Sequence, residues 1–346
     1  MEIDKNYIKN VLGKILNTPS PSGNTEKVMN IVEGEFAKFS TSVKRTNKGA
    51  LIATISGKND DKQKTLSAHV DTLSAMVKEV KSSGRLSIAQ IGGYMGQSVE
   101  GSNCTIETLG GMQYSGTIQT IKPSVHIHSD AKKLDRKIEN YEVVIDEKVF
   151  SKEDVLNLGI DVGDFVFLDP RVVFTKSGFI KSRHLDDKAS VAILLGCAKY
   201  IYDNKIIPEN TINFFISNYE EVGHGASGAI PPRTCEFISV DMGAPGEGQN
   251  STEYSVCICA KDSSGPYDLE LRKRMVDLCK KNSIDYRIDI YPNYSSDASA
   301  ALLAGWDIRT AVIGAGIYAS HGYERTHEDS IINTAKLVIG YIKSAI

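Results

Sequence analysis

Glu220 and Glu221 stand side by side where the apolar run TINFFIS ends, and a glycine-rich turn follows them at once. Other acidic and imidazole side chains also follow an apolar run or precede a helical pattern. They are His69 and Asp71 in TLSAHVDT, Asp186 and Asp187 in SRHLDDKAS, Asp241 in ISVDMG, and His321 in ASHGYERTHEDS. Because ligands of open α/β sheets gather at the carboxyl ends of the strands, this joint placement favours one metal site.

Each of these residues also has a structural explanation when it is taken alone. Asp187 could cap the N-terminus of a helix, Asp71 could occupy a turn, and Glu220 could be a solvated loop charge. A single histidine is likewise more often structural or exposed than a ligand. It is the set of five donors together that favours metal binding.

The types of donor indicate which metal chemistry to expect. Histidine with carboxylates and without cysteine suits zinc in a hydrolytic site, with cobalt or manganese as alternatives, whereas structural zinc usually has thiolate ligands. Two ions fit better than one and need a bridging carboxylate, for which Asp186 is a candidate. The terminal ligands would be His69 and Asp241 on one ion, and Glu221 and His321 on the other.

The adjacent glutamates would then have different tasks. Glu221 would bind metal, and Glu220 would face a water molecule between the two ions and take its proton as general base. This division explains why two carboxylates stand together at the end of a buried strand.

An alternating pattern of helices and strands must position these side chains. It predicts an α/β fold with a mainly parallel sheet flanked by helices on both faces. The expected helices cover residues 7–16, a segment from about 25, residues 189–201 and 270–281, and a last helix from about 329. The expected strands cover residues 50–56, 65–70, 211–217, 237–241, 254–260, 286–291 and 308–314.

The pattern changes between residues 73 and 172, where short β-rich runs are cut by glycines and long helical periodicity is lacking. This texture predicts a small β-barrel domain inserted into the α/β domain. We therefore expect a catalytic domain of residues 1–72 plus 173–346, and an inserted domain of residues 73–172.

Composition excludes several classes of partner. The 346-residue chain has 40 basic and 43 acidic side chains and no basic run that would follow a phosphate backbone, so we expect no nucleic-acid partner. A charged, amphipathic N-terminus and the lack of a long apolar segment predict a cytoplasmic protein without membrane association. Six scattered cysteines without C-x-x-C spacing predict mostly buried free thiols.

The motifs HVD, LDD, EEVG and VDMG, with a histidine near the C-terminus, resemble the tetrahedral aminopeptidases, metallopeptidase family forty-two. This family includes glutamyl, lysyl and deblocking aminopeptidases. PSPSGNTEKV, IGGY and LGIDVGDFVFLD extend the resemblance over nearly the whole chain. It implies the ligand set given above, with Glu220 as general base and Asp71 orienting the His69 imidazole. It also implies peptide substrates and a homo-oligomer, usually a dodecamer with its active sites facing an inner cavity, in which the inserted domain would serve oligomerisation or access.

Three alternatives stay open at this point. The last ligand could be His327 in place of His321, although the distance from the final helix favours His321. The protein could be a related dinuclear carboxypeptidase or N-deacylase, but the interval of 117 positions from His69 to Asp186, against 80 from Asp241 to His321, matches the aminopeptidase branch. A non-catalytic scaffold would have no need of the intact ligand set. His184, His224, His126 and His128 are expected outside the ligand set.

Overall fold

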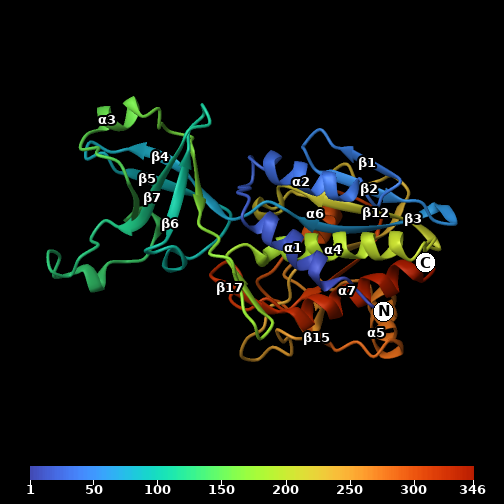
Figure 1. Ribbon diagram of the computed structural model, residues 1–346. Coiled ribbons are helices and arrows are strands. Elements are labelled where there is room, and N and C mark those ends of the chain that lie inside the picture. Colours follow the sequence, from blue (N-terminus) through green and yellow to red (C-terminus); the bar gives the residue numbers. More distant parts are fainter.

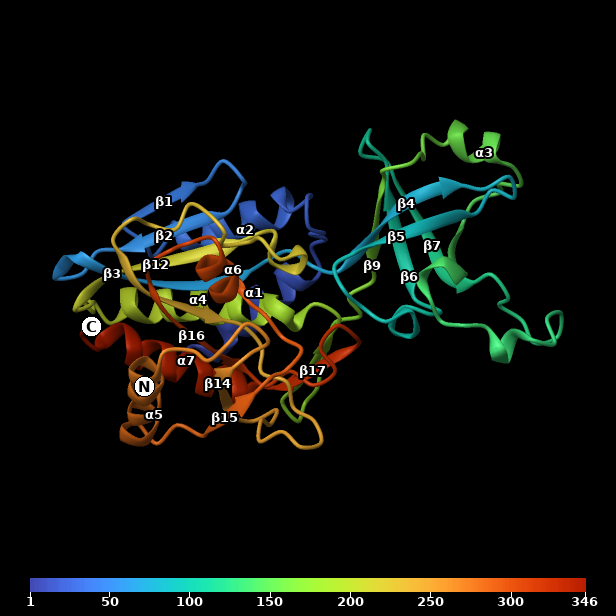
Figure 2. The same cartoon turned by 180° about the vertical axis from the view of Figure 1, so that it is seen from behind.

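The computed structural model describes residues 1–346 and shows a closed β-barrel beside a larger body that is built on an eight-stranded sheet (Figures 1 and 2). Both chain termini lie in the larger body (Figure 1). None of the helices combines the length and the apolar character that crossing a membrane requires.

The large sheet is mixed, and four of its seven neighbouring strand pairs are parallel. The parallel pairs join β12 to β3, β3 to β13, β13 to β16, and β14 to β15, which confirms the predicted mainly parallel sheet. Because β12, β3, β13 and β16 run in the same direction, their carboxyl ends meet at one edge. The strand order is β1 (Ser42–Arg45), β2 (Leu51–Ile55), β12 (Asn210–Ser217), β3 (Asn59–His69), β13 (Thr234–Val240), β16 (Arg309–Ala315), β14 (Val256–Lys261), β15 (Tyr286–Ile290).

Helices cover both faces of this sheet. Side chains of the central strands alternate between two cores, as in β12, where Phe214 belongs to the main core and Phe215 to a smaller one on the opposite face. The main core packs against α1 (Lys5–Leu16), α2 (Glu26–Phe36), α4 (Leu185–Asp203), α5 (Leu269–Lys281) and α7 (Glu328–Lys343). The smaller core packs against α6 (Asp297–Leu303), which Figure 2 shows in front of the sheet.

Helix α4 differs from the sequence-based expectation at its start. It begins at Leu185, so that Asp186 and Asp187 lie in its first turn, although both have non-helical backbone angles. The helix is buried around its circumference because it lies between the sheet and helices α1 and α7. The buried start of α4 therefore brings both aspartates under the carboxyl edge of the sheet.

The barrel confirms the predicted inserted β structure. Its six strands are antiparallel and close in the order β4 (Ser74–Val80), β5 (Leu86–Ile91), β8 (Tyr141–Ile145), β7 (Gln113–Thr120), β6 (Asn103–Glu107), β9 (Phe165–Leu168). The barrel has its own core around Tyr141 and carries the short helix α3 (Lys152–Asn157). The division at residues 73 and 172, and a role of the barrel in assembly or access, remain predictions.

A second, three-stranded sheet was not expected from the sequence, because its strands are short. It consists of β10 (Val173–Phe174), β11 (Phe179–Ser182) and β17 (Glu324–His327), all antiparallel. In this sheet Ser182, just before α4, pairs with Glu324, just before α7. The small sheet thus joins the segment that carries Asp186 to the segment that carries His321.

Polar contacts link the barrel to the larger body. Arg183 is buried and donates from Nη2 to the Ser98 carbonyl and, at 2.8 Å, to Ser102 Oγ of the barrel. Lys27 of α2 forms an ion pair with Glu107 of β6, with 2.5 Å between Nζ and Oε2.

Candidate metal centre

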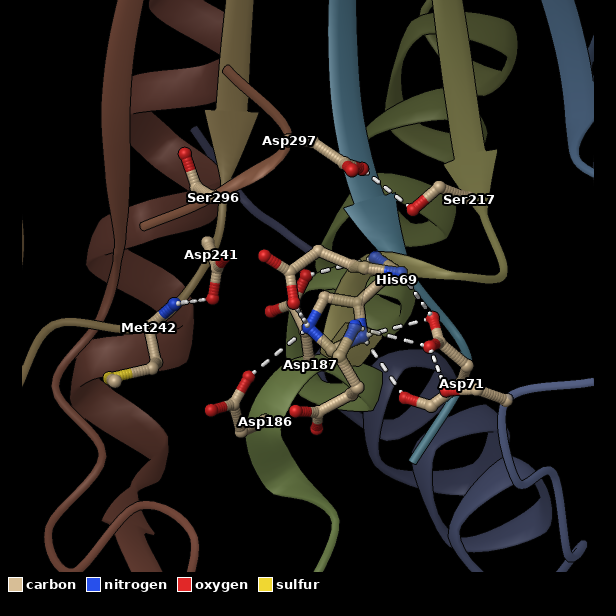
Figure 3. A network of polar contacts seen from close by, with 12 residues as sticks. His69, Asp71, Asp186, Asp187, Ser217, Asp241, Met242, Ser296 and Asp297 are labelled. Atoms are coloured by element: carbon tan, nitrogen blue, oxygen red, sulfur yellow. Dashed lines mark hydrogen bonds and ion pairs between the residues drawn. The ribbon is translucent and has the colours of Figure 1, made fainter. Parts of the chain in front are cut away.

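The donors that the sequence placed at strand ends lie together at the carboxyl edge of the large sheet. His69 is the last residue of β3, Glu220 and Glu221 form a 3-10 turn (Glu220–Val222) after β12, and Asp241 follows β13 directly. His321 lies between β16 and β17. Figure 3 shows Asp186 and Asp71 on opposite sides of the His69 ring, with Asp187 and Asp241 close by.

The carboxylate of Asp186 lies between two imidazoles. Its Oδ1 is 3.3 Å from His69 Nε2, and its Oδ2 is 3.6 Å from His321 Nε2. One glutamate of the doublet approaches the same nitrogen of each ring, since Glu220 Oε2 is 3.6 Å from His69 Nε2 and Glu221 Oε2 is 3.6 Å from His321 Nε2. The Asp186 carboxylate thus faces both histidine–glutamate pairs, His69 with Glu220 and His321 with Glu221.

Asp187 also belongs to the cluster, although the sequence analysis gave it no role as a ligand or base. Ligand atoms of His69, Asp187 and Asp241 lie within 4.8 Å of one another, as do those of His69, Asp186 and Glu221. The first residue before α4 is His184, which makes no side-chain capping bond, and Asp187 keeps a non-helical backbone conformation inside the first turn. Asp187 Oδ2 accepts the backbone N–H of His69 at 3.1 Å, whereas its buried Oδ1 has no hydrogen-bond partner. Its position directly after Asp186 in LDD was the available sequence clue.

Asp71 holds the glutamate doublet as well as the histidine. Its carboxylate accepts the backbone N–H groups of Glu220 at 3.1 Å and Glu221 at 3.2 Å, and the Ser22 hydroxyl at 2.5 Å. For His69 Nδ1, the backbone carbonyl of Asp71 at 3.0 Å is closer than the Asp71 carboxylate at 3.6 Å. A hydrogen bond from Nδ1–H to this carbonyl directs the Nε2 lone pair toward Asp186.

Glu324 fixes the two segments that carry Asp186 and His321, and sequence reasoning missed it. It is fully buried, and its two carboxylate oxygens accept the backbone N–H groups of His321 and Asp186, each at 3.1 Å. His321 has a backbone φ of +63°, a left-handed conformation that non-glycine residues rarely adopt. Its hydrogen bond to Glu324 helps to hold this conformation. The only clue in the sequence was an acid three residues after His321.

The imidazole of His321 is oriented by the barrel. Its Nδ1 contacts the backbone carbonyl of Gly93, which follows β5, and its Nε2 points to Asp186 and Glu221. Donation from Nδ1–H to the carbonyl leaves the Nε2 lone pair available to a metal.

The remaining histidines lie outside this cluster. His327 is the N-cap of α7, where Nδ1 accepts the backbone N–H of Asp329 at 3.2 Å and Nε2 donates to the Ser177 carbonyl at 2.9 Å. His184 is buried, and burial lowers its pKa to about 3. His224 is exposed and stacks on Tyr219, and His126 and His128 lie between β7 and β8 of the barrel.

The closely placed carboxylates of the cluster favour the binding of cations. Burial, with the charge of nearby Asp186, raises the pKa of Asp241 to about 7. Burial likewise raises the pKa values of Glu220, Glu221 and Asp187 well above their usual range, with contributions from neighbouring carboxylates and against the opposing effect of His69. Divalent ions would compensate this repulsion, and the oxygen and imidazole donors, with the unpartnered Oδ1 of Asp187, fit them chemically.

A cavity of about 580 Å³ opens directly onto the cluster. It is lined by Asp186, Glu220, Glu221, Gly223, Asp241, Met242, Ala244, Pro245, Asn293, Tyr294, Ser295, Ile317, Ala319, Ser320 and His321. The acidic cluster is therefore accessible to a molecule of the size of one or a few amino-acid residues.

Comparison with known proteins agrees with this arrangement. Residues 49–337 match the M42 glutamyl aminopeptidase family. The chain belongs to this family. It is 51% identical over 334 residues to "Putative aminopeptidase YhfE" of Bacillus subtilis (strain 168), with 96% of each chain covered. The predicted family is thereby confirmed, and the protein is a peptidase.

Solved structures show the same fold. An aminopeptidase, APDkam598, from the archaeon Desulfurococcus kamchatkensis has a TM-score of 0.89 at 19% identity, covering 99% of this chain and 96% of that one. The TET1 peptidase of Pyrococcus horikoshii has a TM-score of 0.85 at 22% identity, covering 98% of this chain and 100% of that one.

Proposed function

We propose that this peptidase is a dinuclear metal-dependent aminopeptidase that removes N-terminal residues from peptides. The observation that carries the proposal is the Asp186 carboxylate, which faces His69 with one oxygen and His321 with the other. Asp186 would bridge two divalent ions. The terminal ligands would be His69 and Asp241 on one ion, and Glu221 and His321 on the other.

The proposed cofactor is a pair of zinc ions, with cobalt or manganese as alternatives. Such ions polarise a scissile carbonyl and lower the pKa of water toward neutrality. His69 and His321 would contribute neutral imidazoles, because each Nδ1 contacts a backbone carbonyl.

Glu220 is the proposed general base. Its side chain lines the cavity and keeps 14% of its surface exposed, whereas the side chain of Glu221 keeps 3%. The more accessible carboxylate is thus the one that can reach a water molecule and the substrate. Glu220 would take a proton from the attacking water and pass it to the leaving amine.

The alternatives receive less support. A scaffold would gain nothing from five closely placed carboxylates whose mutual repulsion has to be offset, and the relative that shares 51% of its residues is named an aminopeptidase. A carboxypeptidase or N-deacylase would share the metal chemistry, so substrate tests must separate these reactions from aminopeptidase activity.

We also propose that the chain forms a homo-oligomer, with a dodecamer as the expected form. TET1 of Pyrococcus horikoshii is described as assembling into a tetrahedron or a large octahedral shell. The barrel of this chain, proposed as the inserted domain of residues 73–172, exposes the apolar side chains of Leu109, Ile127 and Phe150. Such surface suits contacts between copies. A cytoplasmic location fits peptide turnover and is part of the same proposal.

Hydrolysis of amino-acid p-nitroanilides and of their N-acetylated counterparts tests the proposed reaction. The purified protein would be assayed after chelation and again after divalent ions are restored. The proposal expects metal-dependent release from free-amine substrates only. Release from acylated substrates alone would replace it with the deacylase function.

A further inference from the structure

The walls of the cavity beyond the ionisable cluster are uncharged. They come from three loops, which follow β13, β15 and β16. The apolar wall residues are Met242, Ala244, Pro245, Ile317 and Ala319, joined by Tyr294. The polar ones are Asn293, Ser295 and Ser320, with Gly223 at the glutamate turn.

Tyr294 is fixed as part of this wall. Its hydroxyl donates to the carbonyl of Met242 at 3.1 Å, and its ring lies 5.4 Å from the ring of Tyr291, centroid to centroid. Since the hydroxyl is engaged with the backbone, the aromatic ring is the part left to contact a bound molecule. Tyr294 and Met242 therefore form one rigid patch that links two of the loops.

All acidic and basic side chains that line the cavity belong to the proposed ligands and base, namely Asp186, Glu220, Glu221, Asp241 and His321. An acidic substrate side chain would meet four carboxylates and no lysine or arginine. A basic side chain would find only carboxylates that already serve the metal ions or the proton transfer. Glu247, the next charged residue after Asp241, is exposed and does not line the cavity.

We infer that the enzyme prefers peptides whose N-terminal residue has an uncharged side chain, with aliphatic and aromatic residues as the best substrates. This inference rests on the proposed aminopeptidase function. Burying an apolar side chain against the apolar wall removes apolar surface from water, which favours binding. A charged side chain would lose its hydration there without gaining an ionic partner from the protein, which disfavours binding. The glutamyl preference in the description of the family is therefore not expected for this chain.

A p-nitroanilide panel measures the preference directly. With metal-loaded enzyme, kcat/KM for the leucine, methionine and phenylalanine substrates should exceed the values for glutamate and lysine at least about 100-fold. Binding gives a second readout that does not depend on turnover. Glu220→Gln, loaded with metal, should bind Leu-Gly-Gly more tightly than Glu-Gly-Gly or Lys-Gly-Gly in calorimetric titrations.

A charge added to the wall tests whether these loops set the preference. Asn293 is exposed at the cavity wall, so Asn293→Lys should fold, and it should raise kcat/KM for the glutamate substrate at least about tenfold relative to leucine. Asn293→Gln, the matched control, lengthens the same side chain without adding a charge and should retain the preference for leucine over glutamate. No change of preference in Asn293→Lys would overturn the assignment of these loops to the specificity wall.

The outcomes separate the inference from the function on which it rests. Best activity on glutamate or lysine substrates overturns the inference and leaves the aminopeptidase function intact. No activity on any free-amine substrate, with two ions bound, overturns both.

Discussion

Oδ1 of Asp71 accepts the backbone N–H of Glu220 at 3.1 Å, so a residue just after one strand fixes the proposed general base that follows another. The other carboxylate oxygen accepts the N–H of Glu221 at 3.2 Å. Asp71 itself is fully buried. It therefore connects the end of β3 to the turn after β12 and sets the positions of both glutamates.

Asp71→Asn should reduce kcat and weaken metal binding, each about 10- to 100-fold. The amide keeps the shape of the side chain, but only one of its two terminal atoms can accept hydrogen bonds. Ser22→Ala, which removes a single donor to the same carboxylate, should have a smaller effect. Steady-state kinetics and titration of the apo-protein with Co²⁺ measure both quantities. Equal effects of the two substitutions would argue against a dominant role of Asp71 in holding the doublet.

Glu220→Gln should lower kcat about 10²- to 10⁴-fold and leave two ions bound, because the amide cannot take up a proton. Glu221→Gln should instead lose metal, since it removes a proposed ligand. Metal content by mass spectrometry, measured beside kcat, separates the two roles. If Glu220→Gln lost metal and Glu221→Gln kept it, the roles would have to be exchanged.

Glu324→Gln should weaken metal binding about 10- to 100-fold, although Glu324 is no proposed ligand. A glutamine cannot offer two acceptor atoms to the backbone N–H groups of Asp186 and His321. Glu328→Gln is the control, because Glu328 lies near the same chain segment with 45% of its side chain exposed. Calorimetric titration of the apo-proteins with Zn²⁺ gives the affinities. Wild-type affinity in Glu324→Gln would contradict the proposed positioning.

Lys64 predicts a pH dependence of stability. Burial lowers its pKa to about 7, against about 10.4 for an exposed lysine. Between these values the unfolded chain binds more protons than the folded chain, so this group makes the free energy of unfolding rise with pH. Below about pH 7 the lysine is protonated in both states, and the penalty for burying its charge is present in full.

Lys64→Met should flatten this rise by up to about 1.4 kcal/mol per pH unit between about pH 7 and 10. The substitution also removes hydrogen bonds to the carbonyls of Tyr341 and Ser344, which changes stability at every pH, so the slope is the informative quantity. Urea unfolding at pH 7, 8.5 and 10 provides the slopes. Parallel curves for the two proteins would show that Lys64 does not titrate in this range.

Much of the fold and most of the cluster could be predicted from the sequence, because periodicity reports buried strands and helices directly. The expected strand at residues 211–217 is β12 (Asn210–Ser217), and the expected last helix is α7 (Glu328–Lys343). Acids and imidazoles at the ends of such strands must meet at one edge, which is why His69, Glu221 and Asp241 were found.

Contacts that depend on tertiary structure could not be predicted. Glu324 accepts a hydrogen bond from the backbone of Asp186, 138 residues earlier in the chain, and no local sequence pattern predicts such a bond. The short strands of the sheet formed by β10, β11 and β17 carry too few residues for a periodic pattern. The orientation of His321 by Gly93 likewise arises only from the packing of the barrel against the larger body.

The central claim is that two ions at Asp186 are required for hydrolysis, and a metal titration tests it most directly. Apo-protein would receive increasing equivalents of Co²⁺ or Zn²⁺ while hydrolysis of leucine p-nitroanilide and bound metal are measured together. The account predicts no activity without metal and full activity at two bound ions per chain. In Asp186→Asn, neither ion should bind tightly. Undiminished activity after complete metal removal, or in Asp186→Asn, would contradict it.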